Sequence, residues 1–229
     1  MASLRENKFN PVISLYIDFD ESGSILSNKT VIEKVFIKKN IRLGSWENEF
    51  EANPITSKLP WKGLTDLHFL AKCLLEERSV EKQESIRPST ELKIHVIQRG
   101  NNDISNLDME GTPITKIRKR GSMTDLVVSE FMILANTIWA KNLKNSSIPA
   151  IFRVNKSGVT SMKTISEPHE DLGVEAYAWT TSPLRRYVDY LNQWQLICSV
   201  MFNDSLNTIS KNEIRSEITN FEKKQFLYR

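Results

Sequence analysis

The chain has 229 residues, of which 40% are hydrophobic and 26% are charged, and its formal net charge is +3. This composition is typical of a globular protein and excludes an intrinsically disordered chain. The small net charge excludes a strongly basic surface over the whole molecule, so any contact with nucleic acid has to come from a local patch. The two cysteines, Cys73 and Cys198, exclude a disulfide scaffold and suit a reducing compartment.

Nothing in the sequence indicates a membrane-targeting segment. Residues 1–8 contain no apolar stretch of the kind found in signal peptides. The longest nearly uncharged apolar stretch lies within residues 191–202, which is too short to cross a bilayer. We therefore expect a cytoplasmic protein that does not bind membranes.

The N-terminal part predicts a β-hairpin or meander. Residues 12–20 alternate apolar and polar side chains, residues 29–43 form a second extended run, and a turn sequence at residues 20–23 lies between them. Asp18 and Asp20 point the same way on the first strand, which permits a metal site. We favour the simpler interpretation, in which they mark the solvated end of a hairpin.

The middle of the chain predicts a helix, two strands and a second, more apolar helix. The first helix covers residues 64–78, the strands cover residues 92–97 and 112–119, and the second helix runs over about residues 122–143. The basic run Lys116–Arg120 at the end of the second strand either follows a phosphate backbone or, as we favour, is a solvated strand end.

Glu130 is a carboxylate in the apolar surroundings of the second of these helices. A buried charge without a partner is energetically costly. We therefore predict that Glu130 forms a salt bridge or contacts a ligand hydroxyl.

The C-terminal part predicts a short strand at residues 148–154, a linker-like stretch over residues 155–170, and helices over residues 183–203 and 212–228. These elements together predict an α+β fold, in which a mixed or antiparallel sheet packs against long helices. The sequence contains no internal repeat, no glycine-rich phosphate loop and no cysteine–histidine metal spacing.

The stretch Thr181–Tyr187, with the sequence TSPLRRY, is the strongest candidate for a binding site. Ser182 is a favoured N-cap residue, and Pro183 suits the first helical position. Free amides and the positive end of the helix dipole make such a start an anion site. Arg185 and Arg186 can each grip a phosphate through paired charge-assisted bonds. An ordinary capped helix with two solvated arginines explains the same spacing.

The same stretch resembles the signature of the ribonuclease II (RNB) family of 3′→5′ exoribonucleases. The resemblance is carried by Thr-Ser-Pro-Leu-Arg-Arg-Tyr-x-Asp, from Thr181 to Asp189. The lead-in at residues 168–179, the tail at residues 192–196, and the stretches 130–136 and 148–153 fit the family too. Matches extend from about residue 11 to the C-terminus, so the resemblance implies one RNB domain over nearly the whole chain.

The resemblance implies a role for Arg185, which is expected to contact the scissile or an adjacent phosphate and to stabilise charge in the transition state. Ser182 and Arg186 complete the expected phosphate-binding stretch. Glu222 matches a glutamate that assists the site from the closing helix of the family, so Arg185 and Glu222 are the expected catalytic residues. By its spacing, Asp189 is expected to orient Arg185.

Two further positions belong to the RNA-binding set that the family implies. Trp46 stands where relatives tend to hold a tyrosine that contacts RNA. An exposed aromatic ring can stack on a base, whereas we favour a place for Trp46 in the core or at its edge. Glu130 matches one of two consecutive glutamates of the family, and Ser129 replaces the other.

The family hydrolyses RNA with a divalent metal, expected to be Mg²⁺, held by an aspartate motif of the type D-P-x-x-A-x-D-x-D-D. Residues 1–229 lack this motif, and no metal ligand set is found in them. We therefore expect an RNB domain without its N-terminal metal-binding part, and without S1 or cold-shock domains. One hypothesis is an exoribonuclease that hydrolyses single-stranded RNA. The other is an inactive fragment that acts as an RNA-binding or interaction module. The expected partners are single-stranded RNA and the missing part of the RNB domain or another chain.

Overall fold

The computed structural model describes residues 4–40, 63–79, 90–96, 113–119, 121–202 and 208–227. Its elements in chain order are β1 (Lys8–Phe19), β2 (Ile25–Ile37), α2 (Leu64–Ser79), β3 (Thr90–Val96), β4 (Pro113–Lys119), α3 (Met123–Asn145), β5 (Phe152–Lys156), β6 (Val159–Lys163), the short 3-10 helix η2 (Glu170–Leu172), α4 (Tyr187–Phe202) and α5 (Lys211–Leu227).

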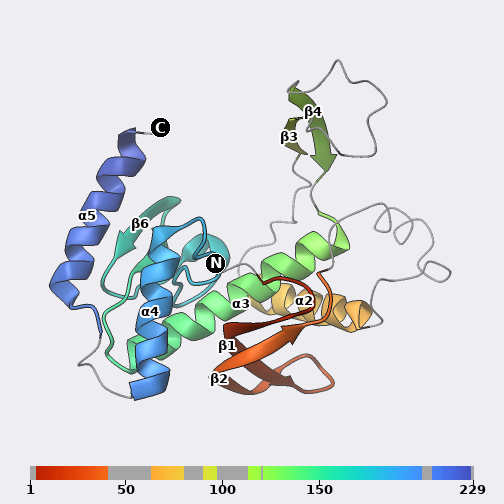
Figure 1. Ribbon diagram of the computed structural model, residues 1–229, viewed down its shortest axis with the longest axis horizontal. Coiled ribbons are helices and arrows are strands. Elements are labelled where there is room, and N and C mark those ends of the chain that lie inside the picture. Colours follow the sequence, from red (N-terminus) through yellow and green to blue (C-terminus); the bar gives the residue numbers. More distant parts are fainter. Residues whose placement is uncertain are drawn as a thin grey trace.

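The described strands form three antiparallel hairpins, β1–β2, β3–β4 and β5–β6. The predicted α+β class, with antiparallel strands and long helices, is confirmed. Figure 1 shows the β3–β4 hairpin projecting away from the other described elements, which gather around α3.

The predicted N-terminal hairpin is confirmed, with strands paired from Lys8 opposite Ile37 to Phe19 opposite Ile25. Asp20 holds the turn, because its Oδ1 accepts the Ser22 N–H at 2.9 Å and the Ser24 N–H at 2.8 Å. A hydrogen bond from the Ser22 hydroxyl is the largest cause that lowers the pKa of this carboxyl. Asp20 is therefore a turn residue, as the simpler interpretation of this segment predicts.

The expected linker over residues 155–170 is wrong, because this segment contributes most of the β5–β6 hairpin. Ser157 and Gly158 join the two strands, and both have positive φ angles, of 51° and 79°. A two-residue turn with this geometry matches the twist of a hairpin. The Ser157 N–H donates to Glu170 Oε2 at 2.6 Å, which ties the turn to η2. The strand expected at residues 148–154 correspondingly lies later in the chain, in β5.

Helix α3 is the centre of the core. Its predicted N-terminus is confirmed, because Ser122 Oγ accepts the Asp125 N–H at 3.3 Å. Its middle packs on α2 and β1 through a cluster that contains Leu74, Leu134 and Ile138. Its C-terminal half packs on β5 and α4 through a larger cluster, which includes Trp139, Ala140, Leu143, Phe152, Val154 and Leu196. One helix therefore holds the two halves of the described structure together.

Helix α3 is also long and apolar enough to cross a membrane, by length and composition alone. Ten of its residues are buried, among them the polar Glu130 and Asn136. Packing against strands and helices on several sides accounts for its apolar character, as expected for the core helix of a globular fold.

Helix α5 packs against α4 and β6. Ile214 and Ile218 of α5 are buried with Val188 and Leu191 of α4 and with Ile151. This contact places α5 beside the N-terminal part of α4, where the candidate binding stretch lies (Figure 1).

Candidate functional site

The segment that precedes α4 is here called the 179–186 loop. A buried side-chain amide of α3 holds its first residues in place. Asn136 of α3 is fully buried, and its Oδ1 accepts the Thr180 N–H at 3.0 Å and the Thr180 hydroxyl at 2.6 Å. Its Nδ2 donates to the Tyr177 hydroxyl at 3.1 Å. A buried side chain whose donor and acceptor are both satisfied holds its partners in one arrangement.

Two side-chain amides of helix α4 also hold the 179–186 loop. Asn192 Nδ2 donates to the carbonyls of Trp179 and Ile151, and its Oδ1 accepts the Ile151 N–H, each at 2.9 Å. Gln193 Nε2 donates to the Thr180 carbonyl at 2.7 Å. The chain therefore reaches α4 along a path that leaves its backbone little freedom.

Helix α4 begins at Tyr187, and not at Pro183 as predicted. The N–H groups of Arg185 and Arg186 both donate to the Ser182 carbonyl, at 3.2 and 3.1 Å, and so close a turn before the helix. The sequence predicted an anion site made of unpaired amides in the first turn of the helix. The amides of Arg185 and Arg186 are hydrogen-bonded within the turn, so they are not part of such a site. The Ser182 hydroxyl, expected to cap the helix, instead accepts from Arg185 Nη2 at 3.4 Å.

Asp189 anchors this turn, and it is fully buried. Its Oδ1 accepts the Ser182 N–H at 2.7 Å and Arg186 Nη2 at 2.6 Å, and its Oδ2 accepts Arg186 Nε at 2.7 Å. The prediction that Asp189 orients Arg185 is therefore wrong. The helix starts one turn later than expected, which brings Arg186, three residues before Asp189, next to the carboxylate.

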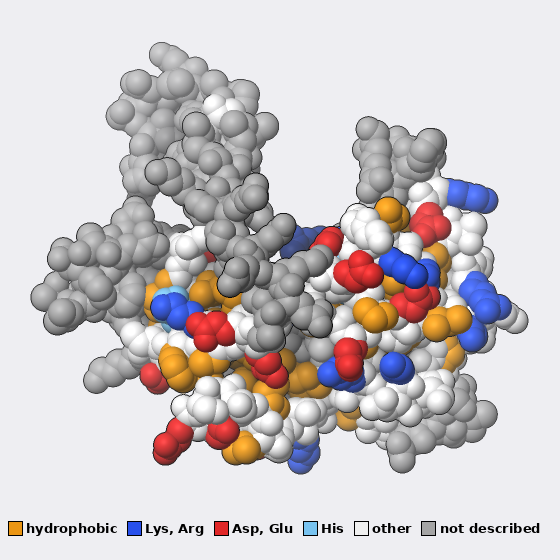
Figure 2. All heavy atoms as spheres, turned by 180° about the vertical axis from the view of Figure 1, so that it is seen from behind, with side chains coloured by type: hydrophobic (Ala, Val, Ile, Leu, Met, Phe, Trp, Pro, Cys, Tyr) orange, Lys and Arg blue, Asp and Glu red, His pale blue; other side chains and the backbone are white. Residues whose placement is uncertain are grey.

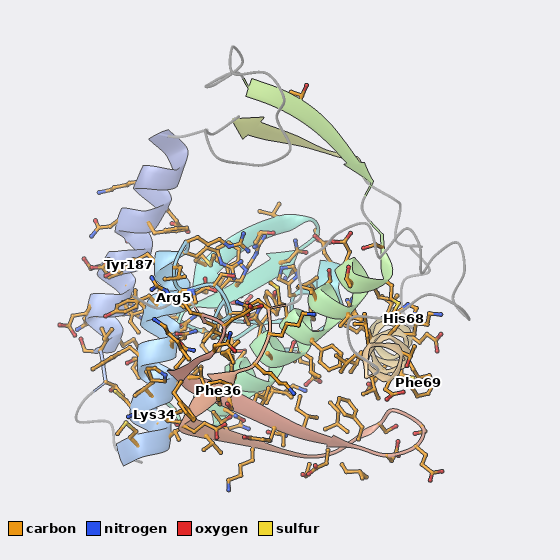
Figure 3. The ribbon with its side chains drawn as sticks, turned by 45° about the vertical axis from the view of Figure 1, so that its right-hand side comes forward. Arg5, Lys34, Phe36, His68, Phe69 and Tyr187 are labelled. Carbon is orange, nitrogen blue, oxygen red and sulfur yellow. The ribbon has the colours of Figure 1, made fainter. Side chains whose placement is uncertain are left out.

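Arg185 is exposed, and the hydrogen bond described for its guanidinium is the long one to Ser182 Oγ. Its remaining donors face solvent, in the fork geometry that matches phosphate oxygens. Tyr187 follows on the exposed side of α4, beside α5 (Figure 3). The arrangement presents the exposed guanidinium of Arg185 on a loop whose backbone is held by buried hydrogen bonds.

Arg186 and Arg153 of β5 both lie over the ring of Trp179. Their Cζ atoms are 4.3 and 4.4 Å from the ring centroid, within the range of a cation–π contact. Burial lowers the pKa of Arg153, and the neighbouring Arg186 charge lowers it further, while Tyr177 acts in the opposite direction. Arg153 and Trp179 thus join the candidate site.

His169 lies close to this group in the core. It is buried, and its ring meets the Tyr177 ring edge to face at 5.4 Å. Burial is the main cause that lowers the pKa of His169, and the Arg153 charge adds to it, against a smaller opposing effect of Asp171. Burial and the Arg153 charge therefore both favour the neutral form of His169.

Glu130 forms the predicted salt bridge. Arg78 of α2 donates to both of its carboxylate oxygens, from Nε at 2.8 Å and from Nη2 at 2.6 Å, and also donates to the Leu172 carbonyl at 2.8 Å. The pair lies in the wall of a cavity of about 280 Å³ between α2, α3 and the segment after η2, lined among others by Leu74, Thr137, Lys141 and Gly173. The described contacts join Glu130 to Arg78 and not to the 179–186 loop, and its RNA-binding role stays a prediction.

The amino-acid sequence matches the RNB domain family over residues 1–166 and 156–201. The chain belongs to the RNB-domain family. A curated relative, the mitochondrial exoribonuclease II of Saccharomyces cerevisiae, is 27% identical over 187 residues, which cover 64% of this chain and 18% of that protein. The chain therefore spans about a fifth of the length of this relative.

Solved structures of RNB proteins have the same fold. RNase R of Mycoplasma genitalium, in complex with ribose-methylated single-stranded RNA, has a TM-score of 0.70 at 17% identity, and the match covers 94% of this chain and 41% of that one. An active-site mutant of the Dss1 exoribonuclease from Candida glabrata gives 0.71 at 17% identity, with 94% and 33% covered. Yeast Ssd1, described as a pseudonuclease, gives 0.66 at 14% identity, with 97% and 33% covered. Identities this low show the fold alone.

Three features that the sequence singled out remain to be placed: Glu222, Trp46 and the basic run at residues 116–120. Glu222 is exposed on α5, and none of the described residues is hydrogen-bonded to it. Trp46 and the side chains of the basic run at residues 116–120 lie outside the described residues. On the face of the RNB domain in Figure 2, acidic and basic side chains are interspersed, so binding of RNA there needs a local patch.

The described part of this RNB domain does not fit a metal centre. Within it, no group of three or more His, Cys, Asp or Glu side chains is placed to hold an ion. The Mg²⁺ expected for the family therefore has no ligand set among these residues, and none of them is assigned a metal-dependent step.

Inspection of the sequence missed four residues that shape the RNB site: Asn136, Arg153, Trp179 and Asn192. All four lie in stretches that resemble the family, at residues 130–136, 148–153, 168–179 and 192–196, so the resemblance was the available signal. The contact between Arg153 and Trp179 joins β5 to the 179–186 loop, and no local pattern predicts that contact.

Proposed function

We propose that this chain binds single-stranded RNA at the 179–186 loop, as part of a 3′→5′ exoribonuclease of the RNB family. The observation that carries the proposal is the exposed guanidinium of Arg185 on a loop whose backbone is held by Asn136, Asn192 and Asp189. A donor fork on a fixed backbone binds a phosphate with a smaller entropic cost than one on a mobile loop. In a complete site the same guanidinium would stabilise charge on the phosphate during hydrolysis.

Hydrolysis in this family is expected to depend on Mg²⁺. We infer that the metal-binding carboxylates are supplied from outside the described residues, by another part of an RNB domain or by another chain. The extent of the relatives supports this division, because the chain covers 33–41% of the RNB structures named above. Arg185 and Ser182 would then supply the phosphate contacts of a site completed elsewhere.

A second function is RNA binding without hydrolysis. It is favoured by the lack of a metal-binding group among the described residues and by the similarity to yeast Ssd1, described as a pseudonuclease. Both functions share the Arg185 contact, so a binding experiment tests what they have in common, and a degradation experiment separates them.

Binding is measured by fluorescence anisotropy with a short, 5′-labelled, single-stranded oligoadenylate. The wild type should bind, and Arg185→Gln should bind about tenfold more weakly, because a hydrogen-bonded charge is lost. Lys34→Gln is the matched control, since Lys34 is exposed on β2, at the other end of α4 from Tyr187 (Figure 3). Equal affinities of wild type and Arg185→Gln would overturn the proposal.

Degradation is measured on the same RNA with Mg²⁺ or Mn²⁺ added. Stepwise shortening from the 3′ end by the chain alone would assign hydrolysis to it and remove the second function. Intact RNA at saturating protein would leave binding as the function of this chain.

A further inference from the structure

The stack of Arg153, Trp179 and Arg186 has an unusual charge arrangement. Two guanidinium groups lie within 4.4 Å of the centroid of one indole ring. All three side chains are partly exposed, so a ligand can reach them from solvent. Two positive charges at one ring repel each other, and a negative charge nearby lowers the energy of that arrangement.

One of the two positive charges is balanced and the other is not. Asp189 neutralises Arg186 through two hydrogen bonds. No carboxylate among the described residues pairs with Arg153, and its Nε is buried without a hydrogen-bond partner. An unmade hydrogen bond at a buried donor is costly. The stack therefore carries one unbalanced positive charge and one unused donor.

The position of Arg153 is fixed before any ligand arrives. Its backbone N–H donates to the Tyr177 carbonyl at 2.8 Å, and Trp179 packs on the buried cluster that contains Ile151 and Val188. The guanidinium thus rests on a ring that belongs to the core. A donor fork held in this way suits an anion with several oxygens, such as a phosphate.

We propose that Arg153, together with Arg186 on the Trp179 ring, binds a phosphate group of the RNA backbone, separate from the phosphate at Arg185. This inference rests on the proposed function, because it places a second contact beside the first. Arg186 follows Arg185 directly, and consecutive Cα atoms lie about 3.8 Å apart. A strand held by Arg185 is therefore within reach of the stack, and a neighbouring phosphate of that strand can supply the negative charge that Arg153 lacks.

The salt dependence of RNA binding reports how many phosphate groups the protein neutralises. For single strands, log K falls with log[salt] with a slope of about −0.7 for each phosphate neutralised. Arg153→Gln should make the slope less steep by about 0.7, and should weaken binding about tenfold. Arg153→Lys keeps the charge and loses the fork, so it should keep the slope and lose part of the affinity.

Lys156→Gln is the matched control. It removes the same charge from the exposed end of the same strand, and should change neither slope nor affinity. Thermal melting of each variant shows that the fold is retained, and Arg153→Lys covers the case in which Arg153→Gln fails to fold.

A second measurement does not depend on RNA. The arginine Nε–H resonances of the ¹⁵N-labelled wild type are followed during titration with dimethyl phosphate, a phosphodiester without base or sugar. The resonance that Arg153→Lys lacks should shift saturably, because an anion bound to the guanidinium changes the surroundings of its Nε–H.

The outcomes separate the two proposals. If Arg185→Gln weakens binding while Arg153→Gln changes neither slope nor affinity, the second contact is overturned and the proposed function stands. If the wild type binds no RNA, the proposed function fails. In that case the titration with dimethyl phosphate tests the second proposal without RNA. A saturable shift of the Arg153 resonance supports an anion site at the stack, and an unshifted resonance overturns it.

Discussion

Replacing Glu130 with alanine tests whether its pair with Arg78 holds the fold together. The two side chains are 3% and 18% exposed, and two hydrogen bonds of 2.6 and 2.8 Å join them. Arg78 also binds the Leu172 carbonyl, so one guanidinium connects α2, α3 and η2. The alanine variant would leave that partly buried guanidinium with the Leu172 carbonyl as its described acceptor.

The expected cost follows from this burial. Removing one partner of a buried ion pair destabilises a protein by about 3–5 kcal/mol, because the other charge stays buried and unpaired. Arg78 keeps its bond to Leu172 and some contact with water, so we expect the lower end, about 3 kcal/mol. Replacing both Glu130 and Arg78 with methionine should recover much of the loss, because similar apolar side chains often substitute for a buried pair at little cost.

The free energy of unfolding is measured from urea titrations followed by circular dichroism. Lys141→Gln is the control, because its pair with Glu175 is long, at 3.8 Å, and exposed. It should change stability by less than about 1 kcal/mol. A similarly small loss for Glu130→Ala would refute the structural role of the pair. A stable Glu130→Ala variant with weakened RNA binding would instead make Glu130 a ligand contact.

Three further changes have defined outcomes. Asn192→Leu removes the bonds to Ile151 and Trp179 and should cost about 3 kcal/mol in urea unfolding. Burial depresses the folded-state pKa of His169, so its contribution to stability is present above the unfolded value of about 6.5 and is lost as pH falls below it. His169→Gln should therefore reduce the loss of stability on acidification; an unchanged pH profile would contradict this. Gly173→Ala places a Cβ 2.5 Å from the Arg78 carbonyl oxygen at φ +65°, whereas Gly158→Ala at φ +79° meets nothing within 4 Å. Gly158→Ala should thus cost about 1 kcal/mol from backbone strain alone. Gly173→Ala adds the clash and should melt at a lower temperature than Gly158→Ala. Equal melting temperatures of the two variants would count against the clash.

Several elements could be predicted because their signals are local. The β1–β2 hairpin follows from alternation around a turn sequence, and the start of α3 follows from Ser122 and Asp125, three residues apart. The burial of Glu130 in an apolar helix face predicted either a salt bridge or a ligand contact, and the structure shows a salt bridge. The partner is Arg78, 52 residues away in the chain. The sequence could not identify it, because the contact depends on how α2 packs on α3.

The start of α4 could not be predicted in the same way. Ser182 and Pro183 form a favourable start by sequence, but Asp189 and the amides of Asn136 and Asn192 hold the preceding backbone in another path. Tertiary hydrogen bonds to buried groups outweigh a local cap, which contributes only about 1 kcal/mol. The same effect changes the partner of Asp189 from Arg185 to Arg186.

The sequence by itself determined the family and the α+β class and pointed to the stretch proposed to bind an anion, because the signals for all three come from residues close together in the chain. The tertiary structure decided how the charges are used. Arg185 is exposed with one long hydrogen bond to Ser182, Arg186 is paired with Asp189, and Arg153 is brought from β5 onto Trp179. These assignments depend on distances across the fold, and buried hydrogen bonds and packing set those distances.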